Sequence, residues 1–559
     1  MFPRLRDALE RASASVNLGY GAPMLLLFVA CVSDPTPPSL EERPPEGVEF
    51  GPEPTCADPS TGLSGLQQQD MPFTQGRPEH KTAGGSGIYL VDVDLDGDVD
   101  VLLGDDYFGP RLLVNDGTGS FTELEAAVPY PLSPHASGIG AVLADLNGDD
   151  LPELITASVG AILLYPNAGG RFSEPSYLWM SELPYTIPGS LSLGDLDGDG
   201  DLDLAMAGLE WISDRCQLDN SCPEDLPNPG SPVLLFQNNG DMSFTALEPL
   251  LVYDEPGYSV ALSFTDREGD GDMDLLVLQD QGRNGRTEAP PSAFFRNDGG
   301  VLTNDAPEIN TNLLISGMGI ATWDLNMDGI LDYCVTDTGP IHCLISDSTG
   351  WYDAGVALGL VPQEVGDAEF WSGWSIELED LDNDGHPEVA VAGGKPTGDT
   401  QTVATYADAI FHGNEDGSFE DLSAEIGFGD TRDHFGMAAA DFDGNGALDL
   451  LLGTSYGPPS RWDNPCTEGA WTDITLRGAL ENRSAIGARV EVEAGNVHLR
   501  RELSSTRAMG QSLGPLHFGL GDATRIDRLH IRWPDGTTSE WADLPVRRPL
   551  TVFHPLRDP

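Results

Sequence analysis

A run of acidic residues suggests that this chain binds cations. Gly194–Gly208 reads GDLDGDGDLDLAMAG, in which five carboxylates fall within nine residues and an apolar segment follows at once. Carboxylates this close repel one another, and an uncompensated cluster beside a buried strand costs free energy. A hard divalent cation removes that cost, because such ions take about six to eight oxygen ligands. The stretch therefore predicts a cation-binding loop that leads into a β-strand.

The same pattern occurs seven times along the chain. Successive copies are separated by roughly 50 to 70 residues, which is the spacing of a repeat architecture. The first aspartates of the copies are Asp92, Asp145, Asp195, Asp266, Asp324, Asp380 and Asp441. We therefore expect each repeat to form one supersecondary unit with one acidic loop.

Within each copy, oxygen-bearing side chains recur at positions 1, 3, 5 and 9, and glycine usually stands at position 6. In the opening copy these are Asp195, Asp197, Asp199 and Asp203, with Gly200 at the turn. Glycine supplies the positive φ that lets a loop wrap alternate side chains round one ion. We expect calcium rather than zinc, because neither His nor Cys stands among these positions.

Up to seven calcium ions are expected, one for each loop, with a structural role. The candidate ligands are Asp92, Asp94, Asp96, Asp98, Asp100, Asp145, Asn147, Asp149, Glu153, Asp195, Asp197, Asp199, Asp201, Asp203, Asp266, Glu268, Asp270, Asp272, Asp274, Asp324, Asn326, Asp328, Asp332, Asp380, Asp382, Asp384, Glu388, Asp441, Asp443, Asn445 and Asp449. Asp150 replaces the position-6 glycine of the second copy, which implies strain there. Glu268 at position 3 makes the fourth site the expected weakest, because its side chain is one methylene longer than the loop expects.

Other interpretations of the acidic loops fit less well. An EF-hand carries a bidentate Glu at position 12, where the first copy has Leu103 and the third has Met206. Tandem nonapeptide calcium repeats would recur every nine residues, and these copies do not. A merely solvated acidic face conflicts with the apolar strand that follows each loop.

The segments around each loop predict antiparallel strands. Apolar runs precede and follow the loop, and a third strand ends in Asn-Gly, Asp-Gly or Gly-Gly, which favours a hairpin. A fourth short strand begins with an aromatic residue, as at Phe121 and Phe419. Four antiparallel strands per repeat correspond to one propeller blade. We predict an all-β fold, a seven-bladed β-propeller over residues 66–470, closed by a strand near Met71–Gln75.

Residues 471–559 differ in composition from the repeats. From Ile474 onward, twelve Arg stand against ten Asp plus Glu, although the whole chain has a formal charge of −63. Leu529, Ile531 and Trp533 alternate with polar residues, as expected for a half-buried strand. We expect a small β-sandwich or barrel that packs on the propeller. The strong acidity of the chain excludes general nucleic-acid binding.

The first 65 residues predict an exported protein. In residues 1–30, arginines precede a short apolar run, Met24–Ala30, which is typical of an export signal and too short to span a bilayer. The sequence FVAC resembles a bacterial lipobox, so Cys31 is a candidate for lipidation. Two alternatives remain open, a cell-envelope or outer-surface lipoprotein and an ordinary secreted protein. The Pro- and Glu-rich residues 31–65 predict a flexible tether.

Six cysteines remain when Cys31 is set aside, an even number that suits disulfides in an oxidising compartment. The expected pairs are Cys216–Cys222 within one loop, Cys334–Cys343 on successive strands, and Cys56–Cys466 across the closure of the ring. Free thiols are the alternative for each pair.

The acidic loops with their strands resemble the FG-GAP or VCBS repeats of integrin α-subunit propellers and many secreted bacterial proteins. The segments LRGALENRSAIGARVEVEAG (Leu476–Gly495) and HFGLGDATRIDRLHIRWPDG (His517–Gly536) resemble the ASPIC/UnbV domain. That domain follows such repeats in the cartilage acidic protein family and its bacterial relatives. The resemblance covers about residues 66–555. It implies an extracellular calcium-binding protein with a role in adhesion or matrix interaction and no established reaction.

Two functions fit these features. The first is a scaffold for adhesion or recognition of an unknown protein or glycan, because the long loops opposite the acidic loops sit on a rigid framework. Aromatic residues in or beside those loops are Trp211, Tyr253, Tyr258, Trp371 and Trp374. The alternative is a secreted polysaccharide lyase or hydrolase. The chain has no HExxH, GxSxG or Gly-rich phosphate loop, so we assign no catalytic residue and predict a non-enzymatic protein.

Overall fold

A computed structural model describes most of the chain after residue 43. The described residues are 44–54, 56, 59–71, 87–104, 110–129, 140–180, 185–212, 230–281, 290–362, 371–394, 407–429, 432–454, 458–479, 481–505 and 510–557. Residues 45–559 form one compact unit. The expected export signal, Cys31 and the Cys216–Cys222 pair lie outside the described residues, as do the tips of the longest loops.

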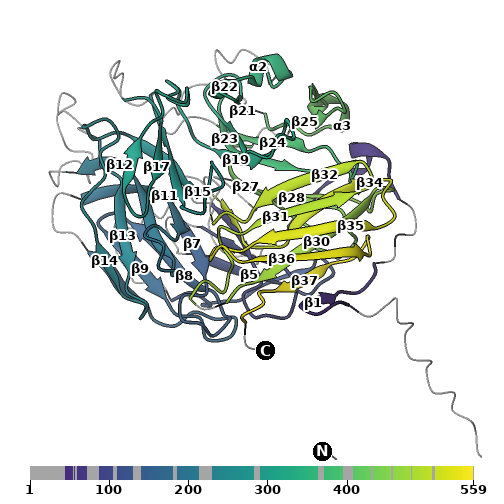
Figure 1. The fold of residues 1–559 in the computed structure, drawn as a ribbon, viewed down its shortest axis with the longest axis horizontal. Helices are drawn as coiled ribbons and strands as arrows, with labels where there is room; N and C mark the ends of the chain where they lie inside the picture. The colour runs from purple at the N-terminus through teal and green to yellow at the C-terminus, as the bar shows by residue number, and fades with distance from the viewer. Residues whose placement is uncertain are drawn as a thin grey trace, which may run out of the picture. The chain divides into compact units, whose positions relative to one another are not determined.

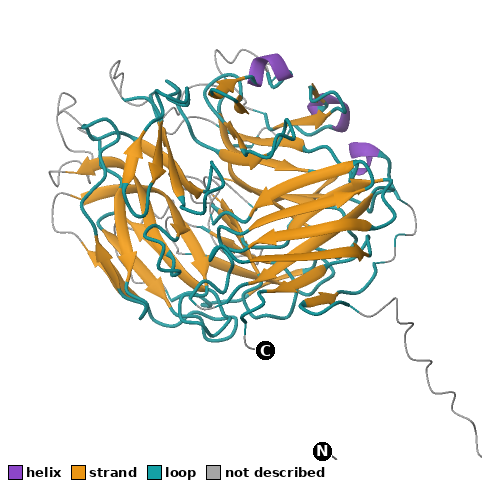
Figure 2. Cartoon of the chain, viewed as in Figure 1, coloured by secondary structure: helices purple, strands orange, loops and turns teal. Residues whose placement is uncertain are grey.

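The described residues are nearly all β (Figure 2). They form nine small sheets, with only two short α-helices, α2 (Gly355–Leu358) and α3 (Ser423–Ile426), and the 3₁₀ turn η2 (Gly62–Gly65). Among these residues no helix has the length and apolar character needed to cross a bilayer. The expectation of an all-β chain is confirmed.

Seven of the nine sheets each contain one acidic loop, and we call these sheets blades 1 to 7 and their loops loops 1 to 7 (Figure 1). Each loop joins the first strand of its blade to the second. The strands of blades 1 to 3 are β3 (Ile88–Val91), β4 (Asp100–Leu103), β5 (Arg111–Asn115) and β6 (Phe121–Glu123); β7 (Ala141–Ala144), β8 (Glu153–Ser158), β9 (Ala161–Tyr165) and β10 (Ser176–Met180); and β11 (Tyr185–Gly194), β12 (Asp203–Ile212), β13 (Leu234–Asn238) and β14 (Phe244–Ala246).

Blades 4 to 7 follow the same plan. Their strands are β15 (Ser259–Thr265), β16 (Asp274–Gln279), β17 (Ala293–Asn297) and β18 (Leu302–Asn304); β19 (Ile320–Trp323), β20 (Asp332–Val335), β21 (His342–Asp347) and β22 (Gly350–Asp353); β23 (Gly373–Glu379), β24 (Glu388–Gly393), β25 (Ala409–Gly413) and β26 (Phe419–Asp421); and β27 (His434–Ala440), β28 (Asp449–Thr454), β29 (Ser460–Asp463) and β2 (Gln67–Asp70). Neighbouring strands within each blade are antiparallel.

The blades contact one another in sequence order. Their first strands touch in the order β3, β7, β11, β15, β19, β23 and β27, and β27 touches β3, so these strands form a closed circle. Apolar side chains fill the space between blades. One buried cluster joins Ile155 of blade 2 to Leu204 of blade 3, and another joins Val101 of blade 1 to Leu451 of blade 7. Burial of these faces is the main force that holds the circle together.

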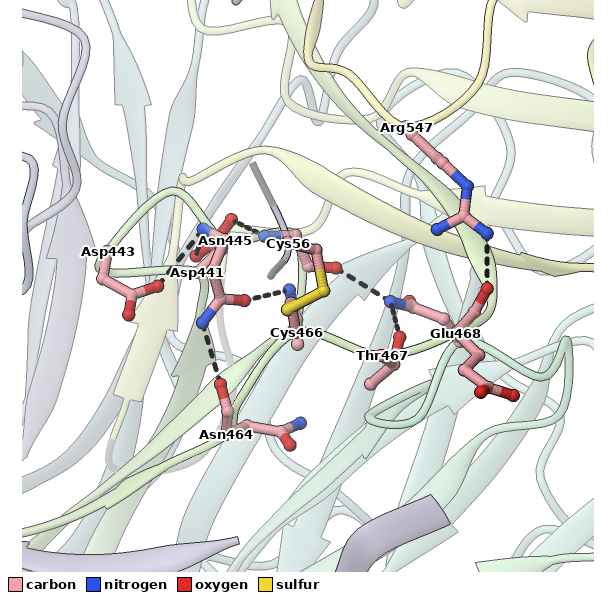
Figure 3. Close-up of a disulfide and its surroundings, with 12 residues drawn as sticks. Cys56, Asp441, Asp443, Asn445, Asn464, Cys466, Thr467, Glu468 and Arg547 are labelled. Atoms are coloured by element: carbon pink, nitrogen blue, oxygen red, sulfur yellow. Dashed lines mark hydrogen bonds between the residues drawn. A yellow bond between two sulfur atoms is a disulfide. The ribbon is translucent and has the colours of Figure 1, made fainter. Parts of the chain in front are cut away.

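Blade 7 is completed by a strand from the N-terminal side, as the sequence suggests. The strand is β2, four residues before the expected Met71–Gln75, and it pairs with β29. Nearby, Cys56 and Cys466 form a disulfide with a Cα–Cα distance of 5.8 Å, and the N–H of Ser60 donates to the carbonyl of Cys466 at 2.8 Å (Figure 3). The second expected pair, Cys334–Cys343, is also formed. Cys334 and Cys343 face each other in the antiparallel pair β20–β21, whereas the Cys56–Cys466 disulfide lies beside a parallel bridge between Ser60 and Thr467.

The C-terminal residues form a tail domain of two sheets. Its strands are β30 (Ala470–Arg477), β31 (Arg489–Ala494), β32 (Val497–Glu502), β34 (Leu516–Gly521), β35 (Ile526–Arg532), β36 (Thr538–Leu544) and β37 (Leu550–Phe553), while β33 (Gly510–Ser512) joins blade 1 instead. One buried cluster runs from Phe518 and Val490 of the tail to Trp323 of blade 5 and Leu378 of blade 6. The tail and the blades therefore share a core.

Part of the expected tether is ordered in the tail domain. β1 (Val48–Phe50) pairs with β37 at the edge of a tail sheet, although residues 31–65 are expected from their composition to form a flexible segment. Val48 is buried, and the guanidinium of Arg548 lies over the Phe50 ring at 5.5 Å. The two apolar residues in an otherwise polar stretch explain why this short piece is held.

Candidate metal loops and the tail domain above them

The position-1 aspartate organises every acidic loop. In all seven loops its carboxylate accepts a hydrogen bond from the backbone N–H of position 6. In loop 3, Asp195 accepts from Gly200 at 3.0 Å and from Gly198 at 2.7 Å. Asp150, which replaces glycine at position 6 of loop 2, adopts a φ of 73° in the left-handed region. The carboxylate thus fixes the turn that gathers the other acids.

The position-9 acid joins its loop to the third strand of the blade. In loop 3, Asp203 accepts from the N–H of Leu196 at 2.9 Å and from that of Asn238 at 2.8 Å. This carboxylate is buried, and burial raises the pKa of Asp203 to about 7. The sequence identified position 9 as a metal ligand but gave no sign of this second, structural role.

Asparagines at the ends of third strands connect neighbouring blades. The amide of Asn297 in blade 4 donates to the carbonyl of Leu196 in blade 3 at 2.8 Å and to that of Met273 in its own blade at 3.1 Å. Asn115 of blade 1 donates in the same way to Phe442 of blade 7 at 2.9 Å, across the closure. From the sequence these residues are recognisable only as hairpin signals.

Three loops bring carboxylates together in the spacing that a metal requires. In loops 1, 3 and 6, oxygens of positions 1, 3 and 5 lie within 4.8 Å of one another. The residues are Asp92, Asp94 and Asp96; Asp195, Asp197 and Asp199; and Asp380, Asp382 and Asp384. Loops 2, 5 and 7 have Asn147, Asn326 and Asn445 among these positions, so fewer carboxylates converge there. The described loops are therefore unequal in charge.

Loop 4 already contains a cation of its own. Arg267 at position 2 is almost fully buried, with its Nε 2.8 Å from Glu268 Oε2 and 3.7 Å from Asp274 Oδ2. Its two terminal nitrogens donate to Asp305 at 2.7 and 2.6 Å. The guanidinium thus sits between the acids of positions 3 and 9. That the fourth site is the weakest stays a prediction, and Arg267 adds a second reason for it.

Loop 6 departs from the all-oxygen donor set expected from the sequence. His412 on β25 places Nδ1 2.8 Å from Glu388 Oε1 and 3.7 Å from Asp382 Oδ2. These three side chains form a second group whose ligand atoms lie within 4.8 Å. His412 is far from the loop in sequence, so only the register between β24 and β25 reveals it.

Arginines of the tail domain approach the acidic loops. The ion pairs are Arg477–Asp92 at 3.8 Å, Arg483–Asp150 at 3.3 Å, Arg532–Asp266 at 2.8 Å and Arg500–Asp324 at 3.6 Å. Deeper in the interface, Arg501 forms a bidentate pair with Glu379 at 2.5 and 2.6 Å and lies over the Trp323 ring at 4.7 Å. The basic composition of the tail thus complements the acidic ends of the blades.

A segment of the tail also pairs with the first strands of blades 1 to 3. β33 runs parallel to β3, and the Gln511 side chain bonds both backbone groups of Leu143, accepting at 2.7 Å and donating at 3.0 Å. Ser505 bonds both backbone groups of Leu193 in the same way, each at 2.7 Å. The tail therefore satisfies polar groups along the inner edges of the circle as well as the loops.

Two protein-family models match the chain. The FG-GAP-like repeat model matches residues 92–156, 145–206, 324–391 and 380–452, and the ASPIC and UnbV model matches residues 478–557. The chain therefore contains FG-GAP-like repeats followed by an ASPIC/UnbV domain. The resemblance inferred from the acidic loops and the tail motifs is confirmed.

Known proteins are similar to this chain at low sequence identity. Cartilage acidic protein 1 of Xenopus tropicalis is 22% identical over 320 residues, which cover 52% of this chain and 45% of that protein, so the match spans under half of the relative. An Agrocybe aegerita lectin that recognises terminal N-acetylglucosamine covers 61% of this chain and 81% of its own, with 16% identity and a TM-score of 0.37. The extracellular domain of a hybrid two-component system of B. thetaiotaomicron covers 89% of this chain and 60% of its own, with 10% identity and a TM-score of 0.40. At these scores we draw nothing about function from the two structures.

A cavity separates the FG-GAP loops from the ASPIC/UnbV domain on one side. It measures about 590 Å³ and lies between loops 1, 2 and 7 and strand β30. Asp92, Asp441 and Asp473 line it together with Arg477 and Trp471. Asp92 Oδ1 is buried there and has no hydrogen-bond partner among the described residues, and burial raises the pKa of Asp92 to about 6.

At the opposite ends of blades 6 and 7, three buried side chains form a chain of hydrogen bonds. His434 Nδ1 lies 2.9 Å from Asp408 Oδ2, and His434 Nε2 lies 3.2 Å from Ser460 Oγ. The arrangement of Ser460, His434 and Asp408 resembles that of a nucleophile, a general base and an acid that orients the base. All three are almost completely buried, and Arg432 also donates to Ser460, so they form a buried hydrogen-bonded network between blades 6 and 7.

The aromatic residues considered as ligand contacts mostly pack inside the FG-GAP blades. Tyr258, Trp371 and Trp374 are buried, and the two indoles donate to the carbonyls of Ala407 and Gly394 at 3.0 and 3.2 Å. Apolar packing with one satisfied N–H accounts for these rings. We therefore no longer count these three among the candidate ligand contacts.

Proposed function

We propose that this protein is a calcium-stabilised scaffold that recognises a protein or glycan outside the cell. FG-GAP repeats suggest an extracellular adhesion or recognition scaffold, and the disulfides favour an oxidising compartment. The observation that carries the calcium part is the convergence of three carboxylates within 4.8 Å in loop 1 and in loop 3. Such groups repel one another without a cation between them.

Loops 1 and 3 fit calcium in their donor chemistry. Their converging side chains are all carboxylates, which calcium prefers, and Asp92 Oδ1 in loop 1 is a buried acceptor that no described group satisfies. Asp92, Asp94 and Asp96 would hold one ion, and Asp195, Asp197 and Asp199 another. Bound calcium would supply positive charge where the turn concentrates negative charge, and so stabilise the junction of first and second strands. Loop 4 has Arg267 in that role and would take no ion.

Recognition is proposed at the end of the blades opposite the acidic loops. Tail arginines and the β33 segment already engage the acidic end and the inner edges, which supports a structural use of that end. The connections between second and third strands begin and end at the other end of each blade, and the longest of them join Ile212 to Leu234, Gln279 to Ala293 and Gly393 to Ala409. Loops on a rigid framework are the usual place for a binding surface.

The matched families are mostly non-enzymatic scaffolds, which favours binding over catalysis. We further propose that the chain is exported and that Cys31 anchors it to the cell envelope through a lipid. Labelled palmitate incorporated into the wild type and absent from Cys31→Ser would support the anchor, whereas equal labelling would contradict it. A glycan and protein array followed by product analysis separates binding from polysaccharide cleavage.

The calcium proposal is tested by thermal unfolding with metal analysis. Calcium should raise the melting temperature relative to chelator and bind at two or more ions per chain. Weak extracellular sites with a Kd of about 10⁻⁴ to 10⁻³ M would each add roughly 0.4 to 1.4 kcal/mol at about 1 mM calcium. Asp195→Asn with Asp197→Asn should remove one ion, whereas Asp241→Asn, on an exposed hairpin of the same blade, should remove none. A melting temperature that ignores chelation would contradict the proposal.

A further inference from the structure

We propose that loop 6 is a mixed nitrogen–oxygen site that selects a transition-metal ion of the zinc type over calcium. The inference rests on the proposed function in one respect, namely that the acidic loops hold cations. It differs from the proposed function in the identity of the ion, because a residue outside the repeat motif determines which ion the loop prefers. That residue is His412, whose imidazole faces Asp382 and Glu388.

The geometry is that of a preformed set of ligands. His412 Nδ1 lies 2.8 Å from Glu388 Oε1 and 3.7 Å from Asp382 Oδ2. Ligand atoms about 2.0 to 2.1 Å from a tetrahedral zinc ion lie roughly 3.4 Å apart. The two measured separations bracket this value. Asp382 also belongs to the carboxylate group of Asp380 and Asp384, so a further oxygen donor is close by.

The charge balance favours an added cation over a simple ion pair. Asp380 and Glu388 are completely buried and Asp382 is 8% exposed. A single imidazolium would compensate one of these three carboxylates and leave the others buried with excess negative charge. Buried charge of this kind is costly unless it is paired or bound to a metal. A divalent ion bound to a neutral imidazole offsets two of the three negative charges, one more than an imidazolium does.

The position of His412 faces the acidic loop in blade 3 as well. His412 immediately precedes Gly413 on the third strand of blade 6. Gly413 pairs with Phe419, the aromatic residue at the start of the fourth strand. In blade 3 the same position is Gln237, whose amide donates to Asp197 at position 3 of its loop. Among the third strands that the structure describes, the residue at this position is an imidazole in blade 6 alone.

The donor set determines the kind of metal. Calcium takes oxygen ligands, whereas imidazole suits zinc and other later first-row ions. Loops 1 and 3 offer oxygens only, so the contrast lies within one molecule. Loop 6 should therefore retain zinc or cobalt in the presence of excess calcium, while loops 1 and 3 exchange to calcium.

Cobalt(II) is the probe, added alone to the full chain after chelation and then challenged with about 1 mM calcium. The wild type should keep one cobalt per chain with visible absorption bands of a nitrogen-containing site. His412→Asn keeps a polar side chain near Glu388 and should weaken cobalt binding at least tenfold, as should His412→Ala. His498→Ala, at an exposed residue of β32, is the matched control and should bind as the wild type does.

Several outcomes decide the matter. Cobalt that calcium displaces completely, or that His412→Asn binds as tightly as the wild type, would overturn the proposal. If neither variant folds, X-ray absorption of the zinc-loaded wild type supplies the answer, because a first shell made of oxygen alone would overturn it. Calcium stoichiometry measured on the same samples reports separately on loops 1 and 3. Failure of the zinc-type site and failure of stabilisation by calcium are thus distinguishable.

Discussion

A single residue beside an acidic loop can compensate its carboxylates. Position 2 is leucine in loops 2, 3, 5 and 6, but loop 4 has Arg267, whose guanidinium reaches Glu268, Asp274 and Asp305. Arg267→Leu should lower the free energy of unfolding in chelator by about 3 to 5 kcal/mol, because it leaves buried acids uncompensated. Urea unfolding measures this. Arg296→Leu, at an exposed pair in the same blade, should cost no more than about 1 kcal/mol, and equal losses would contradict the role of Arg267.

His342 gives the protein a pH-dependent contact outside the metal loops. Burial acts to lower the pKa of His342, but hydrogen bonds with Asp337 and Asp353 outweigh it and raise the pKa to about 9. A raised folded pKa means that the stabilisation is complete below the unfolded value near 6.5 and is lost as the pH rises through about 9. Between pH 6.5 and about pH 9 the wild type should lose on the order of 3 kcal/mol of unfolding free energy through this group. His342→Gln should not show this decrease. If the unfolding free energy of the variant and of the wild type depended on pH in the same way, this role of His342 would be contradicted. His498→Ala is the control and should behave as the wild type does.

At the scale of the blade, buried amides join each element to its neighbour. Asn297→Ala would leave the carbonyls of Leu196 and Met273 without this donor. The cost should be about 2 to 4 kcal/mol, because each buried acceptor loses a hydrogen bond that water does not replace. Denaturant unfolding of Asn297→Ala and of Asn239→Ala, an exposed amide of blade 3, measures the difference. If both variants lose the same small amount, the amide does not connect the blades as described.

Blade strands are predictable from this sequence because their signals are local. Each acidic loop lies between two apolar runs, and hairpin residues and an initial aromatic such as Phe419 mark the outer strands. The loop ligands follow from the same local pattern, since alternate side chains of one turn converge. His412 does not, because its approach to Glu388 depends on the register of β24 and β25. β1 is missed for a similar reason, since its partner β37 lies about 500 residues away.

The arrangement of the tail on the blades also cannot be predicted from the sequence pattern. The pairs Arg532–Asp266 and Arg500–Asp324 connect residues far apart in the chain, and the arginines show no periodicity that would assign them to loops. Composition indicates only that a basic tail follows an acidic array. The structure adds that the tail shares a buried core with blades 5 and 6, so the two parts should unfold together.

Arg501 tests this coupling across the whole molecule. Its guanidinium is 6% exposed, pairs with Glu379 of blade 6 and lies over Trp323 of blade 5. Arg501→Met should lower the free energy of unfolding by about 3 to 5 kcal/mol, because Glu379 stays buried after its cation is removed. Arg525→Met, at an exposed pair of the tail, should cost no more than about 1 kcal/mol. Calorimetry of the wild type should give one transition, since neither part can expose the shared core alone. A wild type that melts in two separate steps, or an Arg501→Met as stable as Arg525→Met, would mean that the tail and the blades are independent.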